Sequence, residues 1–378
     1  MKVTFIITGL ATGGAEMMLH KLLQNIDRNR FEPTVISLMN KGEIGPRIEA
    51  LGIPVHTLGM RRGLPNPLMV LRLARLLRQL QPALVHTWMY HSDLLGGLAA
   101  RLTGCRRVIW GIRHSNLSKT KNKRSTLAVV GLCARLSTWL PVQILSCSHR
   151  AKEVHAAVGY VGEKIHVIPN GFDLGHFAPD VAARASLRTE LGLPPDAPLV
   201  GVVARFDAQK NHLGFVQAAA QLLAQLPQVH FVLAGTGVDG GNAALQAAIA
   251  AHPGLQAHMH LLGRRDDVPR LMAAFDVLAS PSHGEAFPNV LGEAMACGLP
   301  CVVTDAGDSA EIVGSTGRVV AVGDMATLAQ QLQEVLQLPA EQRAALGQQA
   351  RTRVQVEYEI GHVAGLYQAF YERVAAEE

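Results

Sequence analysis

Residues 276–305 read DVLASPSHGEAFPNVLGEAMACGLPCVVTD. An apolar run within DVLASPS (276–282) leads into a segment rich in proline and glycine, and a stretch typical of a helix follows. A second apolar run, PCVVTD (300–305), comes after it. Strand, loop, helix and strand in this order form a βαβ unit, in which the two strands are parallel. The stretch therefore predicts a parallel sheet covered by helices.

The same alternation extends through most of the chain. Seven apolar, β-branched runs lie in the first 170 residues, among them KVTFIIT, LVHTW and RVIWGI, and amphipathic segments such as 68–80 separate them. The alternation stops at IPNGFDLGHFAPD (168–180), and a second series of six runs begins near Leu199. A chain of 378 residues is long enough for two domains. The sequence therefore predicts two α/β domains with a connector between them, followed by a helix over 340–376 that Gly361 interrupts.

The composition excludes several classes of protein. With 48% hydrophobic and 17% charged residues, the chain is globular rather than disordered or fibrous. Its apolar runs are shorter than the roughly 18 uninterrupted residues of a membrane-spanning helix. The apolar run at the N-terminus ends in Gly-rich sequence and a helical pattern, which favours a buried strand over a signal peptide. Five scattered cysteines fit neither a zinc site nor a disulfide framework, which indicates a reducing cytoplasmic compartment.

Charge is distributed unevenly along the chain. Residues 1–190 hold 25 Lys and Arg against 11 Asp and Glu, whereas residues 191–378 hold 10 against 19. Between Asp93 and Glu153 there are eleven basic residues and no acidic one, and eight of the basic residues fall within 101–124. An acid-free stretch favours an anionic partner, and the nearby residues Trp110, Trp139, Leu117 and Leu127 favour a membrane surface over nucleic acid. A plain solvated face is the remaining alternative.

Two glycine-rich or basic segments follow predicted strands and suit a diphosphate. In TGLATGGAE (8–16), Gly13 and Gly14 come after a strand and open a helix, whose first amides can bind an anion. In VVARFDAQKNH (202–212), Arg205 offers a bidentate fork and Lys210 a mobile charge. The alternatives are a structural turn for the glycines and two solvated surface cations.

A third segment carries the dinucleotide-binding pattern G-x-G-x-x-G. VLAGTGVDGG supplies it with Gly235, Gly237 and Gly240, directly after a predicted strand. The pattern favours a nicotinamide-dependent oxidoreductase, but the acidic residues Asp266 and Asp267 lie in a loop rather than at a strand end, where a ribose would need them. A turn after a strand explains the glycines equally well.

The opening stretch holds two carboxylates, Glu285 and Glu293, with seven residues between them. Ser282 and Glu285 match a helix capping box, but Pro288 would then lie inside that helix and remove a hydrogen bond. We therefore expect the helix to start with Asn289 as its N-cap. This places Glu285 in a loop and Glu293 in the first turns of the helix, so the two carboxylates have different roles.

Taken together, GGAE, VARFDAQKNH and SPSHGEAFPNVLGEAMACGLP resemble the family 4 retaining glycosyltransferases of polysaccharide biosynthesis, and the resemblance covers essentially the whole chain. It implies an α/β fold of the GT-B type, with two Rossmann-like domains facing across a cleft and a C-terminal helix that crosses back to the first domain. The expected ranges are 1–172 for an acceptor-binding domain, 173–355 for a nucleotide-sugar-binding domain and 356–378 for the returning helix.

The resemblance also implies roles for individual residues. Glu285 would lie beside the transferred sugar as a catalytic residue, and Glu293 would hold the nucleotide ribose. A histidine that the family places after a strand of the first domain corresponds to His114 in GIRHSN, the second expected catalytic residue, while His86 and His91 are weaker candidates. The remaining expected donor-binding residues are Gly13, Gly14, Arg205, Lys210, Arg264, Phe287, Pro288, Asn289, Val290 and Leu291.

The resulting functional expectation is a retaining, metal-independent transfer from a nucleotide diphosphate sugar, with UDP as the expected nucleotide. No D-x-D motif is present, so we expect neither a divalent metal nor another cofactor. The expected acceptor is a hydroxyl of a glycan or lipid-linked molecule in bacterial surface polysaccharide assembly. The enzyme would be cytoplasmic and peripheral at the inner face of the plasma membrane, held there by stretch 101–124 and without a nucleic acid partner. A sugar-nucleotide epimerase of the same fold and an NAD-dependent oxidoreductase remain as alternatives.

Overall fold

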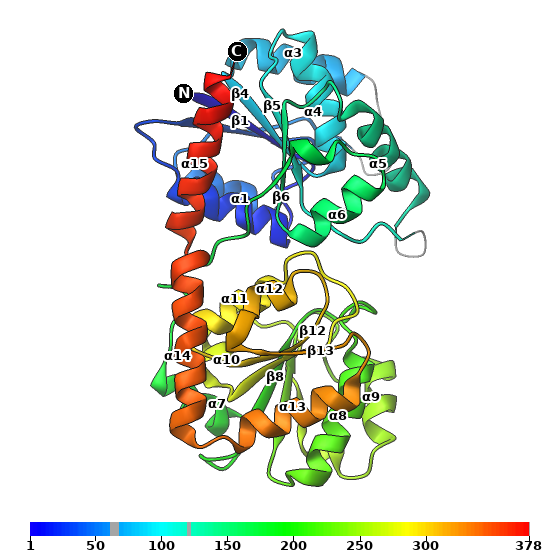
Figure 1. Cartoon of the computed structure of the whole chain (residues 1–378), viewed down its shortest axis with the longest axis vertical. Helices are drawn as coiled ribbons and strands as arrows, with labels where there is room; N and C mark the ends of the chain where they lie inside the picture. Colours follow the sequence, from blue (N-terminus) through cyan, green and yellow to red (C-terminus); the bar gives the residue numbers. More distant parts are fainter. Residues whose placement is uncertain (61–67, 119–121, 378) are drawn as a thin grey trace. The chain divides into compact units, whose positions relative to one another are not determined.

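The computed structural model describes residues 1–60, 68–118 and 122–377. The chain divides into two compact units, one formed by Met1–Gly171 with Ile360–Glu378 and the other by Phe172–Glu359 (Figure 1). The main chain therefore passes between the units twice, after Gly171 and after Glu359. The expected ranges ended at residues 172 and 355, so the second passage comes slightly later than the sequence predicted.

The first unit contains a parallel sheet of seven strands in the order β3-β2-β1-β4-β5-β6-β7. The strands are β1 (Lys2–Ile7), β2 (Glu32–Ser37), β3 (Val55–Thr57), β4 (Leu84–Trp88), β5 (Val108–Ile112), β6 (Gln143–Ser146) and β7 (Ile165–Val167). After its first residue, β1 is buried on both faces, which explains why its sequence is a continuous apolar run rather than an alternating one. All seven expected strands are present.

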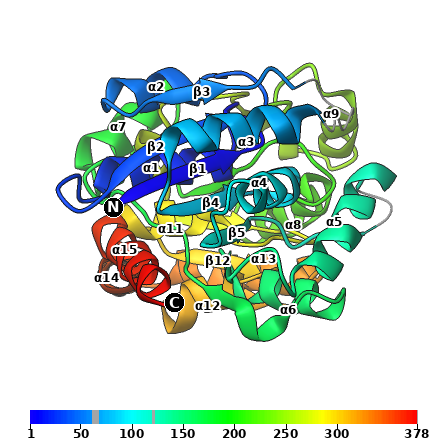
Figure 2. The same ribbon diagram turned by 90° about the horizontal axis from the view of Figure 1, so that it is seen from above.

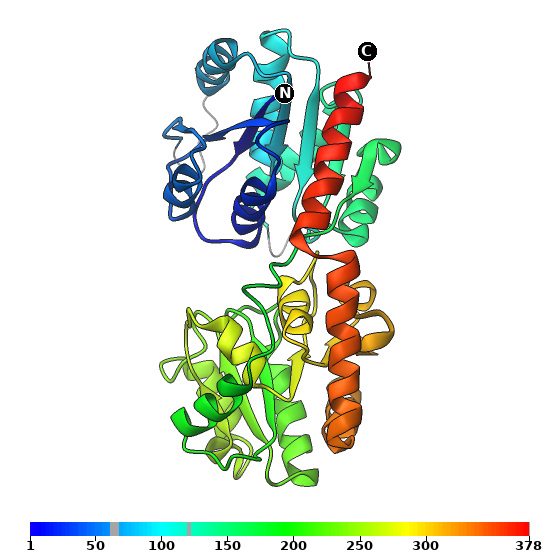
Figure 3. The ribbon, with the colours of Figure 1, turned by 90° about the vertical axis from the view of Figure 1, so that its left-hand side faces the viewer.

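Helices cover both faces of this sheet. They are α1 (Gly14–Asn25), α2 (Ile44–Ala50), α3 (Leu68–Leu80), α4 (Tyr90–Leu102), α5 (Arg124–Leu136), α6 (His149–Ala157), the 3-10 helix η1 (Gly162–Lys164) and α15 (Ile360–Ala376). Helices α3, α4 and α5 follow one another along one face (Figure 2), where Ile6 packs into their core. Helices α1 and α15 lie on the other face with Phe5 and Ile7 (Figure 3).

The second unit contains a parallel sheet of six strands in the order β10-β9-β8-β11-β12-β13. The strands are β8 (Leu199–Val203), β9 (His230–Ala234), β10 (Met259–Leu261), β11 (Val277–Ser280), β12 (Cys301–Thr304) and β13 (Arg318–Val320). The opening stretch thus forms β11, a loop, helix α11 (Asn289–Ala296) and β12, and β11 pairs in parallel with β12 as expected.

Helices also cover both faces of the second sheet. They are α7 (Val181–Glu190), α8 (His212–Gln225), α9 (Ala243–Ala250), η2 (Leu255–Ala257), α10 (Val268–Ala274), α11, α12 (Ser309–Val313), η3 (Gly314–Thr316), α13 (Met325–Gln337) and α14 (Ala340–Glu357). Helices α8, α9 and α13 pack on one face, and α10 and α11 cover the other (Figure 1).

The long C-terminal helical segment is broken, but not at Gly361. Helix α14 ends at Glu357 and α15 begins at Ile360, so the break lies at Tyr358 and Glu359, where the chain leaves the second unit. Tyr358 and Phe172 join the two passages through a main-chain hydrogen bond of 2.8 Å. No helix in the described part of the chain is long and apolar enough to cross a membrane.

Candidate active site

Both sheets reverse their strand order at one point, and such points are where open α/β sheets bind ligands. In the second unit the reversal lies between β8 and β11, which are neighbours in the sheet. The loops that follow their carboxyl ends are 204–211 and 281–288, which contain the expected cations and Glu285. The fold therefore brings the two motifs together, although they are more than 70 residues apart in the chain.

Lys210 and Glu285 form the centre of this region. The Lys210 ammonium donates to Glu285 Oε1 at 2.5 Å, and the Ser282 hydroxyl donates to the same oxygen at 2.7 Å. The Lys210 side chain is 22% exposed and that of Glu285 is 10% exposed. A charge-assisted bond between partly buried groups is shorter and stronger than an exposed ion pair. Glu285 is thus held in one orientation, with a cation beside it.

Local hydrogen bonds fix the loop that carries Lys210. The Asp207 carboxylate accepts from the Gln209 amide at 2.9 Å, and its main-chain carbonyl accepts from the Lys210 amide at 2.9 Å. Asn211 then adopts a left-handed conformation and caps α8 by accepting from the Gly214 amide at 3.1 Å. Asx turns and Asn caps explain why this sequence forms a tight turn ahead of a helix.

The two loops are also tied to each other and to a third. The His283 amide donates to the Gln209 carbonyl at 2.7 Å, and the Asp308 amide donates to the Ala286 carbonyl at 3.1 Å. Gly307 has a φ of +62°, and a Cβ there would lie 2.5 Å from the Glu285 carbonyl oxygen. Only glycine allows this close approach. The main chain at Glu285 is therefore supported from both sides.

Helix α11 begins at Asn289, and Pro288 rather than Asn289 is its N-cap. The expectation that Asn289 caps the helix is therefore wrong by one residue. Pro288 keeps the extended backbone of an N-cap and offers no side-chain hydrogen bond, so the first amides of α11 are not capped by that residue. Glu285 precedes this N-terminus in the loop, and Glu293 lies half-buried in the helix, as the sequence predicted.

Phe287 anchors the start of α11 in the core. Its ring stacks on Phe172 with centroids 6.2 Å apart and meets Tyr358 edge-on at 6.0 Å. Leu291 is fully buried, and a Cβ at Gly292 would lie 2.1 Å from the Phe172 ring. The side chains of Phe287 and Leu291 therefore face the core, so only their main-chain groups are candidates for ligand binding. Val290 is half-buried.

The two expected arginines of this unit are more exposed than Lys210. Arg205 is 68% exposed and lies 3.5 Å from Asp207, and Arg264 is 62% exposed and lies 3.9 Å from Asp266. Exposed pairs of this kind contribute little to stability. Both side chains can therefore reorient toward an anionic ligand at small cost.

The dinucleotide pattern has a structural explanation. A Cβ at Gly235 would lie 2.1 Å from the Ala204 carbonyl oxygen, and Gly237 has a φ of +76°. The glycines thus let the turn after β9 pass close to the end of β8. Asp267 binds Arg265 through two hydrogen bonds, which hold the pKa of the Asp267 carboxyl below its usual range. An acidic residue engaged in this way is not available for a ribose.

In the first unit the strand order reverses between β1 and β4. A pocket of about 650 Å³ lies at the carboxyl ends of β1, β2 and β4. It is lined by Thr8, Gly9, Leu10, Ala11, Glu16, Met39, Asn40, Gly42, Glu43, Met60, Met89 and His91. Gly13 is the N-cap of α1 and Gly14 its first residue, so the expected glycines border this region.

The three expected histidines of the first unit have different surroundings. His114 is exposed in the loop after β5, and His91 lines the pocket. His86 is fully buried in β4, where its Nδ1 accepts from the Tyr371 hydroxyl at 2.8 Å, and burial holds its pKa well below the usual range. His86 is thus a core residue, while His114 and His91 remain candidates.

Sequence reasoning missed three supports of the site. The sequence suggests only a helix-capping role for Ser282, whereas its hydroxyl donates directly to Glu285 Oε1. Asp207 and Gly307 carried no chemical motif of their own. The described part of the chain contains no group of three or more His, Cys, Asp or Glu side chains placed to hold a metal ion.

Comparison with known proteins agrees with this geometry. Residues 12–176 match the family described as Glycosyltransferase Family 4, and residues 197–338 match Glycosyl transferases group 1. The 2-deoxystreptamine glucosyltransferase of Streptomyces kanamyceticus is 32% identical over 296 residues, which cover 75% of each chain. The UDP-Gal:alpha-D-GlcNAc-diphosphoundecaprenol alpha-1,3-galactosyltransferase of Escherichia coli is 31% identical over 62% of this chain and 61% of that protein.

Among solved structures, the Anabaena protein Alr3699/HepE in complex with UDP superposes with a TM-score of 0.85 at 23% identity. The match covers 99% of this chain and 100% of that one. This likeness shows that the fold is GT-B. The chain belongs to glycosyltransferase family 4, and it is a glycosyltransferase of the GT-B type.

Proposed function

We propose that this glycosyltransferase transfers a sugar, with retention of configuration, from a UDP-sugar to a hydroxyl of a glycan or lipid-linked acceptor. The observation that carries the proposal is the contact of 2.5 Å between Lys210 and Glu285 at the strand-order reversal of the second unit. In this proposal the Lys210 cation faces the departing diphosphate, and the neighbouring Glu285 carboxylate faces the transferred sugar. The E. coli relative is named for a UDP-Gal donor and a diphosphoundecaprenol acceptor, which supports the same classes here.

The chemistry follows from the charges of these groups. When the bond between C1 and the diphosphate breaks, negative charge develops on the leaving oxygen, and fixed cations and helix amides stabilise it. Lys210, Arg205 and the first amides of α11, from Phe287 to Leu291, would supply this stabilisation. The acceptor oxygen forms its bond to C1 on the face that the diphosphate leaves, and its proton passes to the released phosphate. Glu293 would hold the ribose hydroxyls, and Arg264 the base.

We further propose that this charge stabilisation needs no divalent metal. In this proposal the Lys210 and Arg205 cations perform the role that a metal held by a D-x-D motif performs elsewhere. Transfer should therefore persist unchanged in EDTA. Loss of activity that magnesium or manganese restores would contradict the metal-free mechanism.

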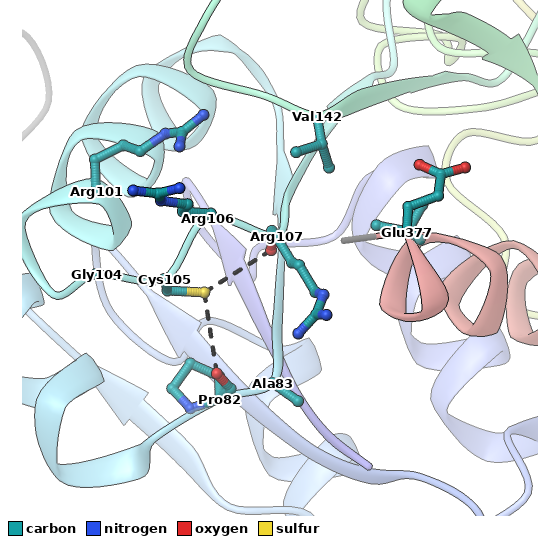
Figure 4. A pocket seen from close by; sticks show the side chains of 10 residues that line it. Pro82, Ala83, Arg101, Gly104, Cys105, Arg106, Arg107, Val142 and Glu377 are labelled. Atoms are coloured by element: carbon teal, nitrogen blue, oxygen red, sulfur yellow. Dashed lines mark hydrogen bonds between the residues drawn. The ribbon is translucent and has the colours of Figure 1, made fainter.

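A membrane location is proposed from the basic stretch 101–124, of which residues 119–121 lie outside the described residues. Arg101, Arg106 and Arg107 line a pocket of about 560 Å³ where β4 and β5 begin, and Glu377 also lines it (Figure 4). Arg101 donates to the main-chain carbonyl of Trp139, whose side chain is 50% exposed. Trp110, in contrast, is fully buried and makes no contribution to such a surface. Arginines beside an exposed tryptophan suit the headgroup region of an anionic membrane leaflet.

The direct test is a donor and stereochemistry experiment. A panel of UDP-, GDP- and ADP-sugars is screened by thermal shift, and the product of the best donor is examined by NMR for its anomeric configuration. We expect the largest shift with a UDP-sugar and a product with the donor's configuration. An inverted product would contradict retention, and turnover of the donor into its epimer without an acceptor would identify an epimerase instead. Vesicle flotation that is equal with neutral and anionic lipid would contradict the membrane proposal.

A further inference from the structure

Arg113, the residue immediately before His114, is held by three separate parts of the first unit. Its guanidinium carbon lies 3.7 Å from the centroid of the Trp88 ring. One terminal nitrogen donates to the Tyr367 hydroxyl at 2.5 Å, and the other donates to Asn170 Oδ1 at 3.2 Å. Both aromatic residues are fully buried. Stacking and charge-assisted hydrogen bonds thus act on one side chain.

The partners of Arg113 lie in the central strand of the sheet and next to the two points where the chain passes between the units. Trp88 ends β4, the central strand next to β1. Asn170 immediately precedes Gly171, where the chain first leaves this unit, and Tyr367 belongs to α15, which follows the return at Ile360. Arg113 therefore connects the loop after β5 with residues that border both passages of the chain between the units.

Stability alone does not account for an arginine at this position. Arg113 is half-buried, and packing its guanidinium against buried aromatic rings removes part of its hydration, which its partners must compensate. Within the described residues, Arg113 Nε is buried and has no hydrogen-bond partner. An apolar residue would fill the same space without this cost. Polar groups that are retained at such a cost are candidates for fixing a specific geometry.

We infer that Arg113 and Tyr367 are positioning residues that hold the His114 side chain in the orientation needed for catalysis. This inference rests on the proposed function and on the expectation that His114 is its second catalytic residue. His114 itself is exposed, and its main-chain carbonyl accepts from the Tyr90 hydroxyl at 3.5 Å. The side chain of Arg113 fixes the backbone on one side of His114, and Tyr90 supports it on the other. Helix α15, more than 250 residues away in sequence, thereby sets the direction of a catalytic side chain.

The main test is Tyr367→Phe, which removes one hydroxyl and keeps the ring. We expect kcat, measured as UDP release from the UDP-sugar selected by the donor screen, to fall about tenfold with the donor KM unchanged, because small displacements of catalytic groups have effects of this size. Arg113→Lys should lower kcat further, since an ammonium cannot stack as a planar fork does. Tyr371→Phe is the matched control, because Tyr371 lies one turn further along α15 and bonds His86 instead. It should keep the wild-type kcat.

A double-mutant cycle distinguishes an effect of Tyr367 on the position of His114 from a general effect on the structure of the unit. In a His114→Ala background, where residual turnover is measured over long incubations, Tyr367→Phe should cause no additional loss, since residues that act through one group are not additive. The His114 imidazole resonance, assigned with His114→Ala, should shift in Tyr367→Phe and stay in place in Tyr371→Phe. An equal loss in both backgrounds with an unshifted resonance would overturn the inference.

The failure of this inference can be distinguished from failure of the proposed function. Full activity of His114→Ala would remove His114 from the reaction and the positioning role with it. Strong loss in His114→Ala together with wild-type kcat and an unshifted resonance in Tyr367→Phe would leave the proposed function intact and refute only the role of Arg113 and Tyr367.

Discussion

The two candidate catalytic residues are supported in different ways. Glu285 is held by groups from neighbouring loops of its own sheet, namely the Lys210 ammonium, the Ser282 hydroxyl and the close approach of Gly307. His114 follows a residue that is held by an aromatic ring of β4 and a tyrosine of the returning helix. The first support is electrostatic and local to one end of a sheet, whereas the second depends on packing between distant parts of the chain.

This difference indicates which kind of substitution would inactivate the candidate site of each unit. A site built from charges within adjacent loops fails when one charge is removed, but its unit keeps folding. A site supported by buried aromatic residues is coupled to the stability of its whole unit. The following predictions test this contrast, beginning with the largest expected effect.

Glu285→Gln tests the electrostatic side most directly. The substitution keeps the shape of the side chain and removes the negative charge that we propose lies beside the transferred sugar. We expect kcat to fall by about 10³-fold, the size seen when a single transition-state contact is lost. Binding of UDP, measured by calorimetry, should stay within about twofold of wild type because Glu285 would not hold the nucleotide. A variant with wild-type kcat would remove Glu285 from the reaction.

Lys210→Ala should weaken UDP binding by about 100-fold, because it removes the partly buried cation expected beside the diphosphate and leaves Glu285 without this partner. Calorimetric titration with UDP checks this. Arg205→Ala serves as the comparison, and we expect a smaller loss because Arg205 is 68% exposed. An equal loss in both variants would show that burial does not distinguish the two cations.

Acid should destabilise the first unit through His155. Burial lowers the pKa of this imidazole to about 4, while its Nδ1 donates to the Ala151 carbonyl at 2.7 Å and Tyr90 lies 2.9 Å from Nε2. The unfolded chain binds a proton near pH 6.5 and the folded chain does not, so stability is complete above pH 6.5 and is lost as the pH falls toward 4. The loss should be on the order of 2 kcal/mol at pH 5.

Calorimetric unfolding at pH 7.5, 6.0 and 5.0 measures this effect. His155→Gln keeps the hydrogen-bonding capacity and removes the titration, so its stability should depend less steeply on pH than that of the wild type. An unchanged slope in His155→Gln would show that this histidine does not carry the acid sensitivity.

Gly307→Ala should have the smallest effect and tests the support of the Glu285 main chain. The positive φ of +62° costs an alanine about 1–2 kcal/mol of stability. The added Cβ, 2.5 Å from the Glu285 carbonyl oxygen, should also displace Glu285 and lower kcat about tenfold. Gly323→Ala is the matched control, because Gly323 has a φ of +86° and nothing within 4 Å of an added Cβ. Equal kcat in the two variants would contradict the supporting role.

The sequence alone is enough to predict the strands, the two α/β units, and the positions of Glu285 in a loop and Glu293 in a helix. Parallel strands that are buried on both faces have continuous apolar sequences. Pro288 cannot lie inside α11, so the sequence predicts the start of this helix to within one residue. These signals are local, so a single chain is enough to detect them. The sequence predicts a break of the last helix at Gly361, whereas the helix is broken at Tyr358 and Glu359, where the chain leaves the second unit.

Tertiary structure alone decided which residues meet. Lys210 and Glu285 lie in one site because β8 and β11 are neighbours in the sheet, and no spacing in the sequence encodes that pairing. Tryptophan and histidine often occur in functional sites, but Trp110 and His86 are both fully buried in the first unit. Arg113 belongs to a basic stretch in the sequence and to an aromatic cluster in the fold, since its partners come from β4, the residue before Gly171 and α15. Contacts between segments that are distant in the chain depend on how helices and strands pack, so a local sequence pattern does not predict them.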